Sequence, residues 1–366
     1  MLKRPYGKTG KDISVVSMGG MRFPKPEDID GMAEIVLHAY RQGVNYFDTS
    51  PSYCGQKSEV IIGKAVKEMK AGTFYLATKS NKPAGSELRR DLETSLKRLN
   101  VDRIAFYHIW WILTMDQWRE RKAGGAVAEV LKAKEEGLVE HVVVSSHLPG
   151  DELKEVLSEG ILEGATLGYC VSNFPYREEA VKAAGEMKLG VVTMNPLGGG
   201  LIPRNAERFG FIKGSGDPSV VAAAIRFNLS NPYVTSALVG FTSKAEVDEA
   251  VEAVRDFRPY GRERITEIRK QVLESFGGLC TGCGYCLPCP AGVPIPKMMD
   301  AYNQKILAGG NPEEVMGNRL KWHWKLEPGD SLACTLCGAC EEACTQHLPI
   351  QERLKEIGQI REEEKS

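Results

Sequence analysis

Two runs of closely spaced cysteines constrain this chain more than any other feature. The runs are Cys280-x2-Cys283-x2-Cys286-x2-Cys289, followed by Pro290, and Cys334-x2-Cys337-x2-Cys340-x3-Cys344. Thiolates at this spacing wrap one corner of an iron–sulfur cubane, and a fourth ligand must come from further along the chain. Zinc usually takes separated C-x2-C pairs, and disulfides are the other alternative. Two triple runs, each with a distal fourth cysteine, favour iron–sulfur clusters over both.

The pairing of the cysteines follows from the way two-cluster ferredoxins are built. There, each run gives three ligands to its own cluster and its last cysteine to the other cluster. By that logic, one [4Fe–4S] cluster is held by Cys280, Cys283, Cys286 and Cys344. The second is held by Cys334, Cys337, Cys340 and Cys289. A chain that carries two such clusters handles electrons one at a time.

The length and composition divide the chain into two expected domains. A length of 366 residues fits two domains, and the composition shifts near residue 277 toward Cys, Gly and Pro. We expect a barrel domain over residues 1–260, a linking helix over 261–276 and a cluster-binding domain over 277–366. Of the ten cysteines, only Cys54 and Cys170 lie outside the two runs, which argues against a disulfide framework.

Charge and hydropathy narrow the expected partners and compartment. The net charge is −1 and the pI about 6.6, so no broad basic surface suggests nucleic acid. No apolar run reaches the length of a membrane span. The start, Met1–Pro5, lacks the apolar core of a signal peptide. We therefore expect a protein of the reducing cytoplasm, and oxygen-sensitive clusters point to an anaerobic host.

Strand and helix patterns alternate between Val15 and Arg255. The alternation gives eight βα units in about 250 residues, the rhythm of a (β/α)8 barrel. A doubly wound sheet needs a Gly-rich phosphate turn after its first strand, and Gly19-Gly20-Met21-Arg22 is not such a turn. The expected fold class is α/β, a TIM barrel followed by a small cluster domain.

Several individual elements are predicted within this frame. Thr166–Ser172 is expected to be the sixth strand of the barrel, and Arg119–Glu136 the helix after the fourth strand. Between the cysteine runs, Pro294–Leu307 and Pro312–Trp324 have helical patterns. The C-terminal domain is therefore expected to be a mainly α-helical, two-cluster ferredoxin-like domain.

Three side chains with complementary chemistry collect at the ends of the early strands. Asp48 ends the second strand, Tyr53 follows in the next loop, and Lys79 ends the third strand. A tyrosine hydroxyl has a pKa near 10, and we expect the Lys79 ammonium, held by Asp48, to lower it. The set then serves as a proton donor to a developing oxyanion. A structural Asp48–Lys79 salt bridge is the alternative interpretation.

The barrel resembles the aldo-keto reductases at these residues. The matching stretches are Asn45–Gly55 (NYFDTSPSYCG), Ala77–Lys79 (ATK), Leu92–Asp102 (LETSLKRLNVD) and Val192–Leu201 (VTMNPLGGGL). The resemblance covers about residues 1–258 and is greatest to the branch that carries a C-terminal ferredoxin-type domain. It implies that Asp48, Tyr53 and Lys79 are three of the family's four catalytic residues.

The fourth residue of the family pattern, a His at the end of the fourth strand, does not match. Ungapped alignment of Asp102–Trp111 (DRIAFYHIWW) places Trp110 there. His108 lies two residues earlier, on the same face of the strand and about 7 Å deeper in the barrel. A local shortening would restore His108, which is otherwise a hydrogen-bonded core residue, and His147 after the fifth strand is a third candidate.

The nicotinamide pocket implied by the resemblance is only partly retained. Contacts to the cofactor are expected at Ser145, Asn173, Pro196, Leu197 and Gly240. Other positions differ from the family pattern. This chain has Ser146 where the family usually has Asn, Tyr169 where it has Gln, Met194 where it often has Tyr, Glu246 where it has the Arg that binds the 2′-phosphate, and Ala250 where it has Asn. A carboxylate repels that phosphate, so these changes weaken NADP binding more than NAD binding.

Three functions are compatible with these features. In the first two, the expected substrate is a small molecule that binds at an apolar, aromatic mouth of the barrel formed by Trp110, Trp111, Trp118 and Met194. In the first function, a ferredoxin or flavodoxin feeds the clusters, which reduce a carbonyl or aromatic substrate with protons from Tyr53 and Lys79. The second is NAD(P)H-dependent carbonyl reduction with accessory clusters. The third is a non-catalytic electron relay or redox sensor. The partly lost pocket favours the first.

Overall fold

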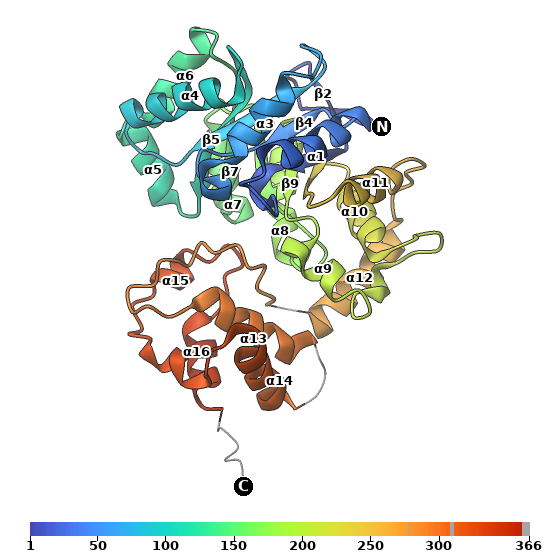
Figure 1. The fold of residues 1–366 in the computed structure, drawn as a ribbon, viewed down its shortest axis with the longest axis vertical. Coiled ribbons are helices and arrows are strands. Elements are labelled where there is room, and N and C mark those ends of the chain that lie inside the picture. The colour runs from blue at the N-terminus through green and yellow to red at the C-terminus, as the bar shows by residue number, and fades with distance from the viewer. Residues whose placement is uncertain (277, 308–310, 361–366) are drawn as a thin grey trace. The chain divides into compact units, whose positions relative to one another are not determined.

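A computed structural model describes residues 1–276, 278–307 and 311–360, and the chain forms two compact units (Figure 1). One unit consists of Met1–Leu197 and Ile212–Ile265. The other consists of Gly198–Phe211 and the described part of Thr266–Ser366. The expected boundary at residue 277 lies outside the described residues, so the domain limits stay a prediction.

The first unit is a closed barrel of parallel strands. In chain order the strands are β3 (Val16–Gly19), β4 (Tyr46–Asp48), β5 (Tyr75–Ser80), β6 (Ile104–Ile112), β7 (Val139–Ser146), β8 (Gly164–Gly168), β9 (Gly190–Met194) and β10 (Ser236–Gly240). Each strand pairs with the next along the chain, and β10 closes the barrel against β3. The predicted α/β barrel is confirmed. Its parallel order brings the carboxyl ends of all the strands to one rim.

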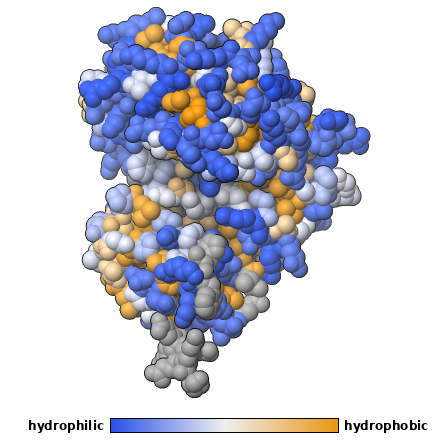
Figure 2. Space-filling view, in the orientation of Figure 1, coloured by the Kyte–Doolittle hydropathy of each residue, from blue (hydrophilic) through white to orange (hydrophobic). Residues whose placement is uncertain are grey.

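Helices cover the outside of the barrel. They are α1 (Ile29–Arg41), α3 (Ser58–Val66), α4 (Gly85–Leu99), α5 (Met115–Ala123), α6 (Ala126–Glu135), α7 (Gly150–Ser158), α8 (Phe174–Glu186), α10 (Val220–Ser230) and α11 (Lys244–Glu252), with the short α2 (Tyr53–Gln56) after β4 and α9 (Leu201–Arg204) in the second unit. The surface seen in Figure 2 is mainly hydrophilic, with hydrophobic residues in small areas. No described helix combines the length and the apolar character that a membrane span requires.

Two predicted elements differ from the structure. The single helix expected over Arg119–Glu136 is two helices, α5 and α6, separated at Gly124 and Gly125. Gly125 has a φ of +86°, and a Cβ at Gly124 would overlap the Pro83 carbonyl oxygen, so the chain turns where only glycine fits. The strand predicted over Thr166–Ser172 ends earlier, at Gly168.

An N-terminal hairpin closes the bottom of the barrel, at the amino ends of the strands. Strands β1 (Lys3–Pro5) and β2 (Asp12–Ser14) pair antiparallel, and Tyr6 follows β1. The Tyr6 side chain is fully buried, with its ring centroid 4.4 Å from that of Phe106. It fits because Gly164 and Gly190 begin the neighbouring strands β8 and β9, where a Cβ would overlap the tyrosine ring.

Gly190→Ala should therefore destabilise the barrel by about 1–3 kcal/mol, since the added methyl group overpacks the Tyr6 site. The matched control is Gly261→Ala, because no atom lies within 4 Å of a Cβ at Gly261 and its φ is not positive. Urea unfolding followed by tryptophan fluorescence measures both variants. Equal midpoints for Gly190→Ala and the control would contradict this packing.

The described part of the C-terminal region is helical, as expected. Its helices are α12 (Arg262–Ser275), which leads out of the barrel, and α13 (Ile295–Leu307), α14 (Pro312–Asn318), α15 (Ala339–Glu342) and α16 (Ile350–Gly358). The predicted helix Pro312–Trp324 is α14 followed by a π-helical turn over Arg319–Trp324. The Trp324 indole donates to Asp300 at 2.9 Å, which ties this turn to α13.

Candidate active site and cysteine groups

A buried ion pair lies at the carboxyl-end rim of the barrel. Lys79 Nζ lies 2.5 Å from Asp48 Oδ1, and each side chain is 4% exposed. The same ammonium donates to Tyr53 Oη at 3.4 Å and lies 4.8 Å from the centre of the tyrosine ring. The structure therefore brings together the three residues that the sequence predicted. An ammonium between a carboxylate and a phenol forms a chain along which a proton can move.

The position of Tyr53 depends on an unusual turn after β4. Tyr53 begins α2, in which Cys54 and Gly55 have left-handed conformations with φ of 53° and 61°. Gln56 follows with a φ of 69°. Three positive φ values in succession, two of them at non-glycine residues, are uncommon, and such backbone strain is typical of functional sites. No sequence pattern predicts this conformation at Cys54.

Burial controls the protonation of the site. It raises the pKa of Tyr53 well above its ordinary value, and the nearby Asp48 carboxylate raises it further. Burial also raises the pKa of Asp48, although the Lys79 ammonium opposes that shift. The expectation that Lys79 would lower the pKa of Tyr53 is therefore wrong in direction. Tyr53 is a neutral phenol at ordinary pH, which is the form that donates a proton.

Trp110 lies beside the proton-donor set. Its ring meets the Tyr53 ring edge to face, with the centroids 5.8 Å apart, and Lys79 Nζ lies 6.0 Å from the Trp110 ring. The pairing of β6 with β7 is irregular between Ile109 and Ile112, and Trp111 in this bulge has a φ of +65°. Bulges next to active sites re-aim side chains. Here the bulge accompanies Trp110, which the ungapped alignment places at the position where the resemblance expects a histidine.

His108 lies inside the barrel. It is directly opposite Lys79 in the β5–β6 register and has no exposed surface. Its Nε2 lies 2.9 Å from Thr166 Oγ1, and its Nδ1 lies 3.2 Å from the Thr78 carbonyl oxygen. Both ring nitrogens thus have partners within the barrel core. Burial, assisted by the Lys79 charge, lowers the pKa of His108 to about 3, so the imidazole is neutral at neutral pH.

The His108 pKa predicts how barrel stability changes with pH. The unfolded chain binds a proton at this histidine below about pH 6.5, whereas the folded chain does so only near pH 3. Stability therefore falls as the pH decreases through this window. His108→Asn removes the effect, so its urea midpoint should change less between pH 7 and pH 5 than the wild-type midpoint does. Equal changes in the two proteins would contradict the buried, neutral histidine.

The other predicted mouth residues lie in different surroundings. His147 follows β7 and is buried, and its carbonyl oxygen accepts from Arg177 at 2.7 Å. Trp118 is fully buried and donates to Glu159 at the far end of α7, so it does not line the mouth. Met194 is the last residue of β9 and is partly exposed. The choice among Trp110, His108 and His147 for the family's histidine role stays a prediction.

The residues expected to contact a nicotinamide cofactor lie at or just beyond the carboxyl ends of strands. They are Ser145 in β7, Asn173 after β8, Pro196 and Leu197 after β9, and Gly240 at the end of β10. Tyr169 differs, because its ring stacks on Phe227 of α10 at 5.9 Å and therefore lies in the helix layer. The cofactor contacts themselves stay predictions.

Glu246 is held at the start of α11. Its two carboxylate oxygens accept from the backbone N–H and the hydroxyl of Thr242, at 2.6 and 2.8 Å. The N-terminus of a helix attracts anions. In this chain, a carboxylate of the protein already lies at that position, where the resemblance places a cofactor phosphate.

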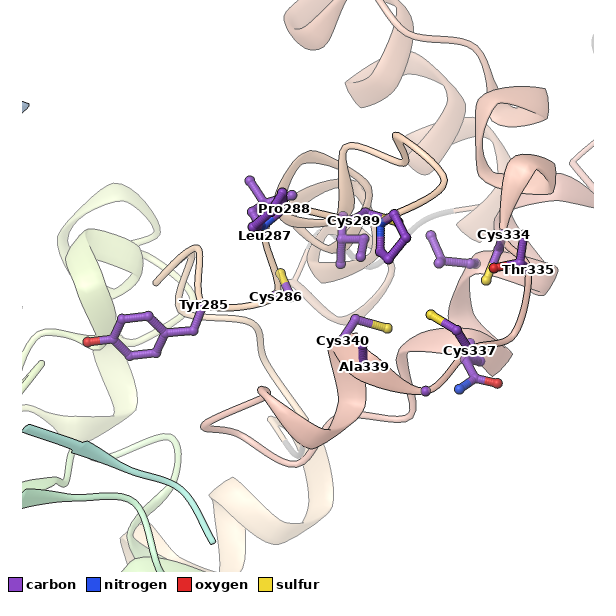
Figure 3. A pocket seen from close by; sticks show the side chains of 15 residues that line it. Tyr285, Cys286, Leu287, Pro288, Cys289, Cys334, Thr335, Cys337, Ala339 and Cys340 are labelled. Carbon is purple, nitrogen blue, oxygen red and sulfur yellow. The ribbon is translucent and has the colours of Figure 1, made fainter. Parts of the chain in front are cut away.

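The cysteines form two groups in the C-terminal unit. Cys280 interacts electrostatically with Cys283, Cys286 and Cys344. A separate cavity is lined by Cys286, Cys289, Cys334, Cys337 and Cys340 (Figure 3). The first group matches one predicted ligand set, whereas the cavity contains the other set together with Cys286, so the assignment of ligands to clusters stays a prediction. They pack against a core that includes Met298, Leu320 and Leu354.

The chemistry of these thiols fits a cationic iron cluster. Burial raises the pKa of Cys280 and of Cys286 to about 12, and that of Cys340 to about 11. Thiolates in such surroundings need positive charge beside them, which metal ions provide. Within the described ranges, no three Cys, His, Asp or Glu side chains converge closely enough to hold one metal ion. The assignment to clusters rests on the spacing and grouping of the sulfurs.

The fold and these sites define a (β/α)8 barrel with a buried Asp–Lys pair beside a partly exposed tyrosine, joined to a cysteine-rich helical unit. The model of the aldo/keto reductase family matches residues 15–272, and that of the 4Fe-4S dicluster domain matches residues 279–349. The chain therefore belongs to the aldo/keto reductase family and is an oxidoreductase with a C-terminal ferredoxin-type 4Fe-4S domain. The resemblance seen in the sequence is confirmed.

Relatives and solved structures agree with this assignment. L-galactose dehydrogenase of Arabidopsis thaliana is 27% identical over 304 residues, which cover 72% of this chain and 91% of the relative. The NADH-specific methylglyoxal reductase of Escherichia coli is 25% identical, over 57% of this chain and 71% of its own. The holo form of aldo-keto reductase AKR11C1 from Bacillus halodurans has a TM-score of 0.64 and 23% identity, over 74% of this chain and 96% of that structure. The last comparison shows the shared fold.

Proposed function

We propose that this protein reduces a small carbonyl or aromatic substrate at the barrel mouth with single electrons that arrive through two [4Fe–4S] clusters. The observation that carries the proposal is the presence, in one chain, of the Asp48–Lys79–Tyr53 set and two neighbouring groups that together contain eight cysteines. A ferredoxin or flavodoxin is the proposed electron donor. Hydride transfer from a nicotinamide requires no cluster, whereas single-electron supply does.

The residues of the barrel supply the proton for the substrate oxygen. Reduction of a carbonyl to an alcohol takes two electrons and two protons. The proton that forms the new C–H bond comes from solvent at the barrel mouth, and Tyr53 gives the other proton to the substrate oxygen. Lys79 lies 3.4 Å from the tyrosine oxygen and replaces that proton, while Asp48 holds the ammonium in position. Trp110 offers a flat apolar face beside Tyr53, which suits an aromatic or conjugated substrate.

Tyr53→Phe should lower turnover by about 10²–10⁴-fold, the usual contribution of a positioned proton donor. Reduced methyl viologen serves as the electron source and methylglyoxal as the carbonyl probe, under anaerobic conditions. Tyr40→Phe is the matched control, because Tyr40 is bonded to Thr73 on the outside of the barrel. Iron content should stay constant in both variants. Unchanged turnover in Tyr53→Phe would remove the tyrosine from the mechanism.

The ligand pairing can be tested with double variants. Cys280→Ala with Cys344→Ala removes two ligands of one proposed cluster, so about four irons should remain. Cys280→Ala with Cys289→Ala removes a ligand from each cluster, so little iron should remain. If each run instead holds its own cluster, the two results exchange. Iron and sulfide analysis of anaerobically purified protein therefore decides between these two pairings.

NADH-dependent carbonyl reduction is the second candidate. Ser145, Asn173 and Gly240 lie at or just beyond the carboxyl ends of their strands, where the resemblance expects the cofactor, and one relative is named an NADH-specific methylglyoxal reductase. In this candidate the Glu246 carboxylate, which already accepts two hydrogen bonds at the start of α11, disfavours the 2′-phosphate of NADPH.

Fluorescence titration with NADH and NADPH separates the candidates. Under the single-electron proposal, neither nucleotide binds at high micromolar concentration and neither supports turnover of methylglyoxal. Binding of NADH that sustains turnover without a one-electron donor would contradict the proposal and favour the second candidate. Tight NADPH binding would contradict the role given to Glu246.

A further inference from the structure

The surface around the second cysteine group has an apolar character that its fold does not require. Leu332 and Leu336 are 64% and 66% exposed, and only Leu273 among the large apolar side chains in the described part of the chain is comparably exposed. Leu287, 47% exposed, lines the cavity that contains Cys289, Cys334 and Cys337. Leu332 and Leu336 flank Cys334 and Thr335, which belong to the same cavity wall, and we therefore call Leu287, Leu332 and Leu336 the apolar patch. A patch of this kind marks a contact surface more often than scattered leucines do.

The apolar patch lies next to the proposed iron ligands. Leu336 stands between Thr335 and Cys337, which both line the cavity, and Cys337 is itself exposed (Figure 3). Leu336 also has a left-handed backbone with a φ of 59°. An exposed leucine in this conformation does not stabilise the fold by burial, and its left-handed backbone is sterically unfavourable. Its side chain is available to a partner next to Cys337, an exposed proposed ligand of the second cluster.

Negative charge borders the apolar patch. The two cysteine-bearing segments, residues 278–296 and 327–352, contain no Lys or Arg. Their carboxylates are Glu327, Asp330, Glu341, Glu342 and Glu352. Glu327 and Asp330 cap the turn that carries Leu332, while Glu341 accepts from the backbone N–H of Gln351, another residue of the cavity wall. The border is therefore acidic, and a complementary partner is cationic.

We propose that the apolar patch is the docking site of a small one-electron carrier protein whose cofactor edge is apolar and ringed by Lys or Arg. The inference rests on the proposed single-electron function, adds to it the entry point, and narrows the proposed ferredoxin or flavodoxin to one that presents a basic docking face. Opposite charges at the rim steer the encounter, and the leucines exclude water from the contact. Such transient redox contacts are small, which fits a patch of three leucines.

Cytochrome c, a small basic haem protein, is the probe for this surface. The anaerobically reduced protein is mixed with oxidised cytochrome c, and haem reduction is followed by absorbance in a stopped-flow instrument. Electron transfer across the same surface runs in either direction, and the reduction potentials set which one is observed. The rate should fall as NaCl is raised from about 20 mM to about 300 mM, because salt screens the attraction. With an acidic ferredoxin as the acceptor, the rate should rise over the same range.

Two variants test the surface itself. Leu336→Asn removes the apolar contact and suits the left-handed backbone, and Glu342→Lys reverses one charge of the border. Each should lower the cytochrome c rate at low salt by about fivefold or more. Leu273→Asn is the matched control, since Leu273 is 65% exposed on α12, away from the cysteines in the sequence. Iron content and the methyl viologen rate should stay at wild-type values in all three variants.

Several outcomes would overturn the docking proposal. A cytochrome c rate that is insensitive to Leu336→Asn and to Glu342→Lys would do so. A rate that rises with salt would exclude a cationic partner, and a dimer that Leu336→Asn dissociates would show that a second copy covers the patch. Failure of the proposed function gives a different result, namely no methylglyoxal reduction with methyl viologen while cytochrome c reduction still depends on the patch.

Discussion

The proposed chemistry of this protein depends on a lysine held beside an aspartate inside the barrel, where each side chain is only 4% exposed. Removing two charges from water is costly, and a buried ion pair adds little to stability by itself. The Asp48–Lys79 pair lies at the rim with a tyrosine beside it, which is why we propose for it a role in proton supply rather than in folding. Burial also raises the pKa of Tyr53, so its phenol is neutral and can serve as the proposed proton donor.

Around this pair, several side chains differ from those expected in an enzyme that transfers hydride from a nicotinamide cofactor. Trp110 stands beside Tyr53, while His108 is bonded to Thr166 and to the backbone of Thr78 in the core. A neutral imidazole with both nitrogens occupied offers no bond to a substrate oxygen. At the start of α11, the Glu246 carboxylate accepts a hydrogen bond from the Thr242 backbone N–H. The family resemblance places the 2′-phosphate of the cofactor at this helix N-terminus. The proposed proton-donor set is thus in place, whereas Trp110 and Glu246 differ from what the family resemblance leads one to expect around a nicotinamide cofactor.

Much of the architecture was predictable because it depends on local patterns. The βα rhythm specifies the barrel, and the cysteine spacing specifies the two sulfur groups, since neither requires knowledge of distant contacts. Asp48, Tyr53 and Lys79 were also predictable, because parallel strands bring their carboxyl ends to one rim. Features that depend on tertiary packing were not. The break at Gly124 and Gly125, the burial of Trp118 against α7 and the outward stacking of Tyr169 each follow from neighbours far away in the sequence. The direction of the Tyr53 pKa shift was missed for the same reason, because burial outweighs a nearby ammonium.

The central claim is that electrons reach the barrel one at a time through the iron clusters. Rapid freeze-quench electron paramagnetic resonance tests it directly, with the dithionite-reduced protein mixed with excess methylglyoxal after removal of dithionite. The account predicts that the signals of the reduced clusters decay at the rate of single-turnover product formation, with about two electrons lost per product. Reduced clusters that persist while NADH alone drives product formation would contradict it.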